Sequence, residues 1–292
     1  MEYYQINDLE RLTGIKAHTI RIWEKRYNLI EPYRSETNIR YYDDDQVKKL
    51  LNVATLLDNG WKISKIARLN DADIRKHILQ IKDSPEQGNV NISFINDLVA
   101  AMLTFDEAGF EKIFSAAVTR MGMYNAMLNV FYPFLHKTGV LWSADKAAPV
   151  QEHFASHLIR KKLMAAIDGL PVSHKKDKRF LLFLPENEWH DIALLFSDYI
   201  IRSNGYSTLF LGQNLPSANL GIILSKQKFT HFLSFFITGH NVEERINDIL
   251  EQVKKYKSLQ LLLSGNISES NIYKKEKCVS ILKSVDDLLK IL

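Results

Sequence analysis

Cysteine is almost missing from this 292-residue chain, in which Cys278 is the single example. One thiol excludes an intramolecular disulfide framework and a cysteine-rich zinc site. Long apolar runs are missing too, since the longest, such as residues 180–185, fall far short of the roughly 20 residues that cross a bilayer. The N-terminal residues 1–5 lack the basic and apolar segments of a secretory signal. We therefore expect a cytoplasmic protein without a membrane segment.

A strong excess of one charge is also lacking, because 38 Lys and Arg stand against 34 Asp and Glu. The net charge of +4 does not by itself indicate nucleic acid, but its distribution does. Residues 11–42 hold seven basic side chains and three acidic ones, which are Arg11, Lys16, Arg21, Lys25, Arg26, Arg34 and Arg40 against Glu24, Glu31 and Glu36. Such a local excess is a better footprint for phosphates than the charge of the whole chain.

Residues 1–81 are predicted to form a first domain of short helices. Ile6, Leu9 and Leu12 recur at helical spacing before the stop at Thr13-Gly14, and a second helix is expected over residues 17–27. Two helices joined by a tight glycine-containing turn are typical of a helix-turn-helix. The polar stretch 31–42 favours a hairpin with its tip at residues 35–38, and further helices follow the aspartates at 43–45.

The polar residues 82–91 are interpreted as a linker, and residues 93–172 as a four-helix bundle. In this bundle we expect Gly122, Pro133, Gly139 and Pro149 at the corners between helices.

From residue 178 to residue 292 apolar runs alternate with helical patterns. The expected strands are residues 180–184, 208–211, 231–237 and 259–263, with helices between them. This alternation predicts a doubly wound, parallel, Rossmann-like sheet. The predicted fold class is thus multidomain α and α/β, with a winged helix-turn-helix, a four-helix bundle and a doubly wound sheet.

The first domain resembles the DNA-binding domain of the MerR family of transcriptional regulators. The matching words are residues 6–9 (INDL), 13–15 (TGI), 19–27 (TIRIWEKRY) and 40–42 (RYY). The resemblance implies a dimer on distorted promoter DNA. It places Lys16, His18, Thr19 and Arg21 nearest the major groove, and Arg34, Arg40 and Tyr41 on the flanking backbone or minor groove. The alternative is that these charges form a solvated face; for Trp23, Tyr27 and Tyr42 a place in the core is preferred.

The remaining domains resemble the CarH-like cobalamin-binding regulators of the MerR family and, more distantly, the cobalamin module of methionine synthase. The family's bundle motif W-x9-E-H is matched by Trp142 and Glu152-His153. Its loop motif D-x-H-x-x-G is matched at His190, with Glu188 in place of the acid and Ala193 in place of the glycine. Later elements appear as residues 234–236 (SFF) and 264–265 (SG).

This resemblance implies that adenosylcobalamin is bound, with His190 as the lower axial ligand of cobalt and Trp142, Glu152 and His153 over the upper face. Glu188, Ser234 and Gly265 would complete the cofactor site. The chemistry agrees: a loop after the first strand lies at the carboxyl edge, where doubly wound sheets bind ligands. An imidazole there can coordinate cobalt, and a carboxylate can hold its other nitrogen.

The implied function is a light-responsive, non-enzymatic regulator. Its implied partners are double-stranded promoter DNA, further copies of the chain in a dimer or tetramer, and RNA polymerase.

Two other functions stay open. Glu188 and Ala193 favour a regulator whose sensor region has lost cobalamin and serves in oligomerisation or binds another ligand. A corrinoid carrier module of a methyltransferase is disfavoured by the N-terminal winged domain. His153 and His157 have the spacing of a zinc pair, but the glutamate precedes the first histidine, unlike H-E-x-x-H.

Overall fold

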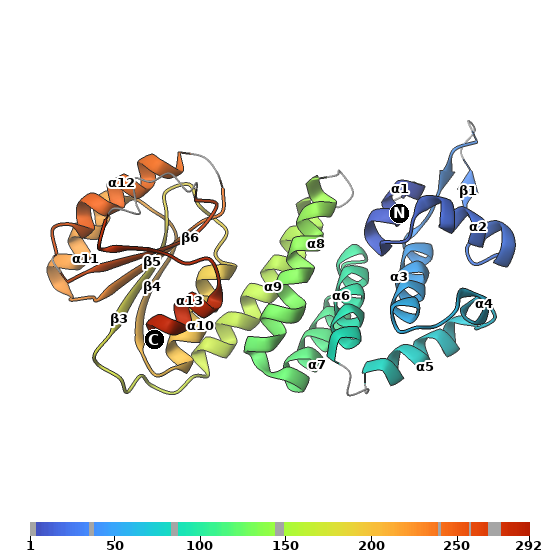
Figure 1. Ribbon diagram of the computed structural model, residues 1–292, viewed down its shortest axis with the longest axis horizontal. Coiled ribbons are helices and arrows are strands. Elements are labelled where there is room, and N and C mark those ends of the chain that lie inside the picture. The colour runs from blue at the N-terminus through green and yellow to red at the C-terminus, as the bar shows by residue number, and fades with distance from the viewer. Residues whose placement is uncertain are drawn as a thin grey trace. The chain divides into compact units, whose positions relative to one another are not determined.

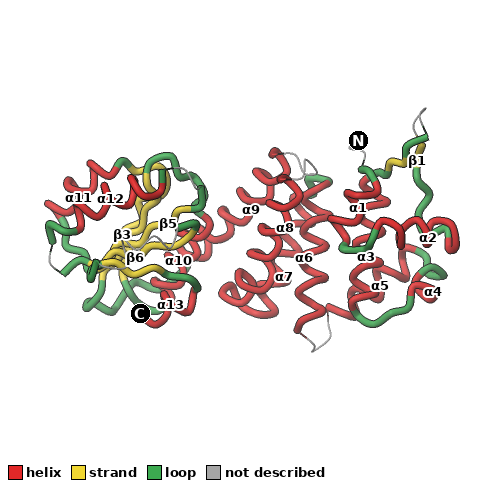
Figure 2. The backbone as a smooth tube through the Cα atoms, turned by 45° about the horizontal axis from the view of Figure 1, so that its top comes forward, coloured by secondary structure: helices red, strands yellow, loops and turns green. Residues whose placement is uncertain are grey.

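The computed structural model describes residues 4–34, 38–82, 87–143, 149–238, 241–256, 258–267 and 276–292. The chain divides into two compact units, residues 1–158 and residues 159–292, which are described separately. The first unit is helical with one small hairpin, and the second is built around a sheet (Figure 1, Figure 2). None of the helices in the described ranges is long and apolar enough to cross a membrane.

The first unit opens with a winged helix-turn-helix. Its elements are α1 (Ile6–Thr13), α2 (Ala17–Tyr27), β1 (Tyr33–Arg34), β2 (Arg40–Tyr41), α3 (Asp44–Asp58), α4 (Ile63–Ile66) and α5 (Asp71–Lys82). Gly14 closes α1 with φ +76°, a conformation that glycine adopts without strain. Asp43 and Gln46 form a capping box that starts α3. The predicted hairpin is present as antiparallel β1 and β2, and its tip at 35–37 lies outside the described residues.

The core of this winged domain is apolar, with Leu9, Leu12, Ile20 and Leu50 fully buried. Tyr42 is also fully buried, and its hydroxyl donates to Glu24 across 2.5 Å. Burial, followed by this hydrogen bond to an acid, raises the pKa of Tyr42. Trp23 and Tyr27, which were also preferred as core residues, are only half-buried.

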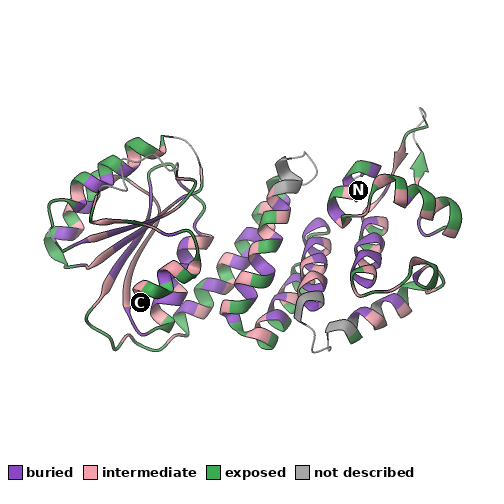
Figure 3. Cartoon of the chain, viewed as in Figure 1, coloured by how far each residue is buried: buried purple, intermediate pink, exposed green. Residues whose placement is uncertain are grey.

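The bundle consists of α6 (Gln87–Leu103), α7 (Glu107–Ala126), the π-helical segment η1 (Met127–Phe131), α8 (Tyr132–Ser143) and α9 (Pro149–Asp168). The linker prediction is wrong from Gln87 onward, because α6 already begins there. Its apolar residues Val90, Phe94 and Leu98 are buried at helical spacing, so packing outweighs the polar composition (Figure 3).

The predicted corners of the bundle are only partly right. Gly122 lies within α7, where its non-helical φ of +78° and ψ of 158° kink the helix. Pro133 is not at a corner, because η1 runs directly into α8 at that point, and Gly139 lies further along α8. Pro149 does begin a helix, as the first residue of α9.

The second unit contains a five-stranded parallel sheet in the order β4-β3-β5-β6-β7. Its elements are β3 (Arg179–Pro185), α10 (Ile192–Ser203), β4 (Ser207–Leu215), η2 (Ser217–Asn219), α11 (Leu220–Lys226), β5 (His231–Phe236), α12 (Val242–Val253), β6 (Gln260–Gly265), β7 (Val279–Ile281) and α13 (Val285–Ile291). Helices α11 and α12 cover one face, and α10 and α13 cover the other (Figure 1, Figure 2). The predicted doubly wound fold is confirmed, with the short edge strand β7 as an addition.

The strand order reverses between β3 and β5. From β3 the chain crosses to β4 on one side, and from β4 it crosses back to β5 on the other side of β3. In open α/β sheets such a reversal leaves a crevice at the carboxyl ends of the strands, where ligands bind. The loops that follow β3 and β5 are therefore where the second unit should carry its site.

Candidate functional site

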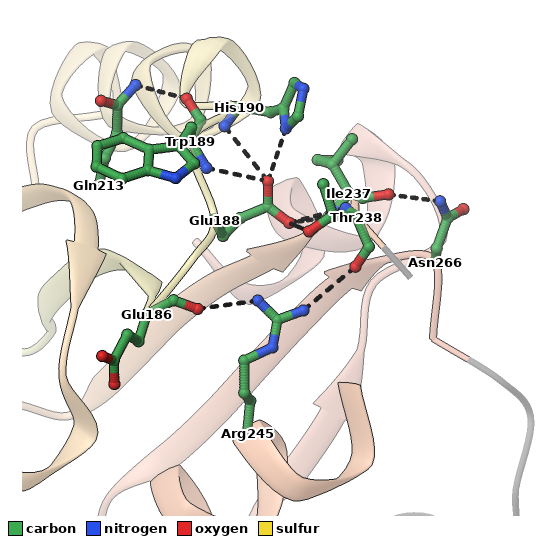
Figure 4. Close-up of polar contacts among 9 residues, drawn as sticks. All are labelled: Glu186, Glu188, Trp189, His190, Gln213, Ile237, Thr238, Arg245 and Asn266. Atoms are coloured by element: carbon green, nitrogen blue, oxygen red, sulfur yellow. Dashed lines mark hydrogen bonds and ion pairs between the residues drawn. The ribbon is translucent and has the colours of Figure 1, made fainter. Parts of the chain in front are cut away.

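Glu188 and His190 lie in the loop that follows β3, and their side chains are in contact. Glu188 is fully buried, and its Oε1 lies 2.7 Å from Nδ1 of His190 (Figure 4). The same oxygen accepts the backbone N–H groups of Trp189 and His190 across 3.2 and 3.4 Å. The carboxylate of Glu188 thus fixes both the loop and the imidazole.

The second oxygen of Glu188 reaches the loop that follows β5. Its Oε2 accepts the backbone N–H groups of Ile237 and Thr238 across 2.9 and 2.8 Å, and the Thr238 hydroxyl across 2.8 Å. Glu188 therefore bridges the two loops at the point where the strand order reverses. The extra methylene of glutamate, compared with the aspartate of the family motif, is accommodated in this span.

The hydrogen bonds decide the charge of Glu188. Burial alone raises the pKa of this carboxyl, but the bonds from His190 and Thr238 outweigh burial and lower the pKa to about 2. An ionised carboxylate only accepts hydrogen bonds, so Nδ1 of His190 carries a proton, and in the neutral imidazole Nε2 then keeps the lone pair. His190 is 55% exposed in its side chain, and it can therefore present Nε2 to a ligand.

An imidazole held in this way suits a metal that brings most of its own ligands. Carboxylate support of the far nitrogen fixes the tautomer and orientation of a ligating histidine. In the described part of the chain, no group of three or more His, Cys, Asp or Glu residues could hold a bare metal ion. One supported histidine would suit the cobalt of a corrin, because the corrin ring would supply the other nitrogen ligands.

Two further predicted residues lie at the ends of neighbouring strands. Ser234 of β5 is fully buried, and its hydroxyl finds no hydrogen-bond partner within the described ranges. Gly265 ends β6 with φ +108°, and a Cβ there would lie 2.2 Å from the carbonyl oxygen of Phe236. The unsatisfied buried hydroxyl is compatible with a polar ligand that enters the sheet edge, whereas the restriction to glycine follows from the close approach of the Phe236 backbone. Ala193 is half-buried at the second position of α10.

The three predicted bundle residues belong to the first unit. Glu152 and His153 lie in the first turn of α9, with His153 Nδ1 3.8 Å from Glu152 Oε2 and the histidine side chain 67% exposed. Trp142 lies on α8, and its side chain is outside what the structure describes. The rings of His153 and His157 are 6.2 Å apart, and no third ligand joins them among the described residues.

The predicted DNA-reading residues lie at the start of α2. His18 and Arg21 are exposed, and Thr19 is half-buried, with its hydroxyl 3.3 Å from His18 Nε2. Lys16 is exposed as well, but its Nζ pairs with Glu10 across 2.9 Å. Arg21 is therefore the cation that we single out for the major groove.

The hairpin residues are held by local contacts. Arg34 donates to the Asn38 side chain across 2.5 Å, Arg40 pairs with Glu24 across 3.3 Å, and Tyr41 stacks on Tyr33 with 5.4 Å between ring centres. The acid Glu24 partly neutralises Arg40. These pairs set the shape of the wing, and Arg34 is the more exposed of the two arginines.

Several residues of the second-unit site were not predicted from the sequence. Thr238 donates two of the hydrogen bonds that hold Glu188, and Arg245 of α12 donates to both loops. Gln213, in the segment 212–216 that the sequence places at the pocket rim, donates to the Trp189 carbonyl across 2.5 Å. The positions of Thr238 and Gln213 in the fold could have indicated them as site residues. Both lie near the carboxyl ends of the strands that flank β3.

The comparisons with known proteins match two separate segments of the chain. Residues 4–73 match the model of the MerR HTH family regulatory proteins, and residues 94–166 match that of the B12 binding domain. The chain is 26% identical over 221 residues to the HTH-type transcriptional repressor CarH of Myxococcus xanthus, which covers 75% of this chain and 73% of the repressor. It is 30% identical over 95 residues to the HTH-type transcriptional regulator TnrA of Bacillus subtilis, covering 30% of this chain and 82% of that one.

Among solved structures, the monomethylamine corrinoid protein of Methanosarcina barkeri has a TM-score of 0.57. The sequence identity is 13%, over 69% of this chain and 97% of that protein, so the likeness shows the fold alone.

Proposed function

This chain belongs to the MerR family of helix-turn-helix regulatory proteins, and we propose that it is a promoter-binding regulator whose sensor region binds adenosylcobalamin through His190. The observation that carries the proposal is the Glu188–His190 contact of 2.7 Å at the carboxyl edge of the sheet. The match of residues 94–166 to the B12 binding domain supports the same cofactor. The relatives are transcriptional regulators, so the function is regulatory and not enzymatic.

The protein's own groups have defined tasks in this proposal. Glu188 would hold the proton of His190 on Nδ1, so that Nε2 of His190 would hold the cobalt of the cofactor. Ser234 would offer its buried hydroxyl to the nucleotide tail, and Gly265, at the end of β6, is proposed to line the same site. Trp142, Glu152 and His153 of the first unit are proposed to contact the upper face. When bound, adenosylcobalamin supplies a cobalt–carbon bond that light can break.

The output of the proposed switch is DNA binding. We propose that copies of the chain assemble as a dimer or tetramer on double-stranded promoter DNA in the cytoplasm, where RNA polymerase is the further partner. The cofactor can change this assembly only by binding one state more tightly than another. Arg21 and Arg34 would provide groove and backbone contacts from each copy.

The test is uptake of adenosylcobalamin by the purified full-length protein in the dark. Wild type and a His77→Ala control, altered on a half-buried histidine of α5, should retain the corrinoid through gel filtration. The His190→Ala variant should lose the absorption spectrum of a histidine-ligated corrinoid. Illumination of the cofactor-loaded wild type should change both its absorption spectrum and the mass of its oligomer.

The other outcomes select the rival functions. Wild type that binds promoter DNA but takes up no corrinoid would be a regulator whose sensor serves in oligomerisation or binds another ligand. Corrinoid uptake without sequence-preferring, salt-dependent DNA binding in a gel-shift would indicate a carrier module.

A further inference from the structure

Arg245, on the first turn of α12, spans the same crevice as Glu188 by a separate route. Its Nη1 donates to the carbonyl oxygen of Glu186 across 3.1 Å, and its Nη2 donates to the carbonyl oxygen of Thr238 across 3.2 Å (Figure 4). Glu186 begins the loop after β3, and Thr238 lies in the loop after β5. One guanidinium therefore ties the backbones of the two loops together.

The separation of these loops determines whether Glu188 can contact His190 and Thr238 at the same time. Its Oε1 must reach His190 while its Oε2 reaches the amide and hydroxyl of Thr238, and all three contacts lie between 2.7 and 2.8 Å. The two oxygens of a carboxylate are a fixed distance apart. A greater distance between the loops would therefore break the contact with either His190 or Thr238. Because His190 is oriented through Oε1, an error in loop separation becomes an error in the direction of the imidazole.

The other anchors of these loops act on one loop each. Gln213 of β4 holds the Trp189 carbonyl across 2.5 Å, and Asn266, which follows β6, holds the Ile237 carbonyl across 2.6 Å. Arg245 differs from these anchors because it donates to carbonyls of both loops.

Arginine suits this task better than lysine. The guanidinium is a rigid planar fork, so its two donating nitrogens keep a fixed distance between the carbonyls that they bind. The group also lies over the ring of Phe236, with 5.4 Å from its central carbon to the ring centre. A lysine keeps the charge but is a flexible point donor.

We propose that Arg245 is a positioning residue that sets the separation of the two loops, so that Glu188 orients His190 toward the cobalt of the cofactor. This inference rests on the proposed function. It assigns to α12 a part in coordination that the family motifs, which lie in the loops and strands, do not contain. Arg245 itself contacts neither His190 nor the cofactor in this role.

The test uses cobinamide, a corrinoid without a nucleotide tail, in its cobalt(II) form. This probe has no axial nitrogen of its own, so nitrogen splitting in its electron paramagnetic resonance spectrum reports ligation by the protein. Full-length wild type, Arg245→Lys, Arg245→Met and Lys255→Met are compared. The last variant removes a positive charge from just beyond the same helix, at an exposed residue whose Nζ donates to the Gln252 side chain.

Wild type and Lys255→Met should show the nitrogen splitting, and ¹⁵N-histidine labelling should change its pattern. Arg245→Met should lose the splitting and bind the probe about tenfold or more weakly, the usual loss when support for a metal ligand is removed. Arg245→Lys should also lose most of the nitrogen splitting, because a positive charge without the planar guanidinium does not fix the distance between the two loops. Splitting and affinity equal to Lys255→Met in both Arg245 variants would overturn the inference.

Glu188→Asp separates positioning from general destabilisation. The shorter acid already loses its contact with one of the two loops. Adding Arg245→Lys to Glu188→Asp should therefore reduce the affinity for cobinamide much less than Arg245→Lys does alone. Fully additive losses would overturn the inference even if Arg245→Met fails to fold. A wild type without nitrogen splitting would instead overturn the proposed function, and this inference with it.

Discussion

Lys137 of α8 donates a hydrogen bond to the side-chain oxygen of Asn96 on α6 across 3.1 Å. The amide nitrogen of Asn96 in turn donates to the Thr55 hydroxyl on α3 across 3.0 Å, and Thr55 is buried. This polar chain joins the third helix of the winged domain to two helices of the bundle. Burial lowers the pKa of Lys137 to about 8, against the attraction of Asp58, which raises it.

The buried amine predicts an unusual rise of stability with pH. Between about pH 8 and 10.5 the unfolded chain keeps the proton on Lys137 while the folded protein has lost it, so the folded state gains stability as the pH rises. From pH 7.5 to 9.5 we expect Lys137 to add about 2 kcal/mol to the free energy of unfolding. Urea denaturation across this range measures it.

The matched variants are Lys137→Met and Lys112→Met, the second at an exposed position of α7. The first should flatten the rise, and the second should keep it. Equal pH dependence in wild type and Lys137→Met would contradict a neutral buried amine.

Glu188 predicts the opposite behaviour in acid. Its folded pKa of about 2 lies below its ordinary value of 4.5, so its contribution is complete above pH 4.5 and is lost as the pH falls toward 2. Glu188→Gln should lower the free energy of unfolding by roughly 3 kcal/mol at pH 7 and by much less at pH 3. Chemical denaturation at both values checks this, with the exposed Glu251→Gln expected to change little. A pH-independent deficit in Glu188→Gln would refute the role of its charge.

Gly265 is predicted to tolerate no side chain. An added Cβ would meet the Phe236 carbonyl at 2.2 Å, and the φ of +108° is strained for any other residue. Gly265→Ala should destabilise the protein by about 1–3 kcal/mol. Gly139→Ala, whose Cβ meets nothing within 4 Å, should be neutral or stabilise α8 by up to about 1 kcal/mol. Thermal melts of the two variants should therefore move apart, and equal shifts would argue against strain at Gly265.

Arg21 is predicted to carry more of the DNA affinity than Arg40. Arg21 is exposed on α2, whereas Arg40 is paired with Glu24. Arg21→Ala should weaken binding to the promoter by about 1–3 kcal/mol, while Arg40→Ala should have the smaller effect. Gel-shift titrations at several salt concentrations measure both, with Lys112→Ala as the control for lost charge. A larger loss in Arg40→Ala would reverse the assignment.

Local sequence signals predicted most of the elements. The helix α2 spans the predicted residues 17–27, because Gly14 ends the preceding helix and apolar residues recur at its spacing. The apolar run at residues 180–184 lies within β3, which is buried along most of its length. The strand β7 was missed, because its three residues (VSI) are too few to form a pattern.

The sequence by itself determined where most helices and strands form, which segment resembles a DNA-binding domain, and that His190 follows the first strand of a doubly wound sheet, because these features depend on neighbours along the chain. Only the tertiary structure decided what surrounds that histidine. Glu188 meets Thr238 across 50 residues, and Arg245 meets Glu186 across 59. The replacement of aspartate by glutamate looked like a loss in the linear motif, but the space between two folded loops fits the longer acid. Such a span is a property of packed strands, and no local spacing encodes it.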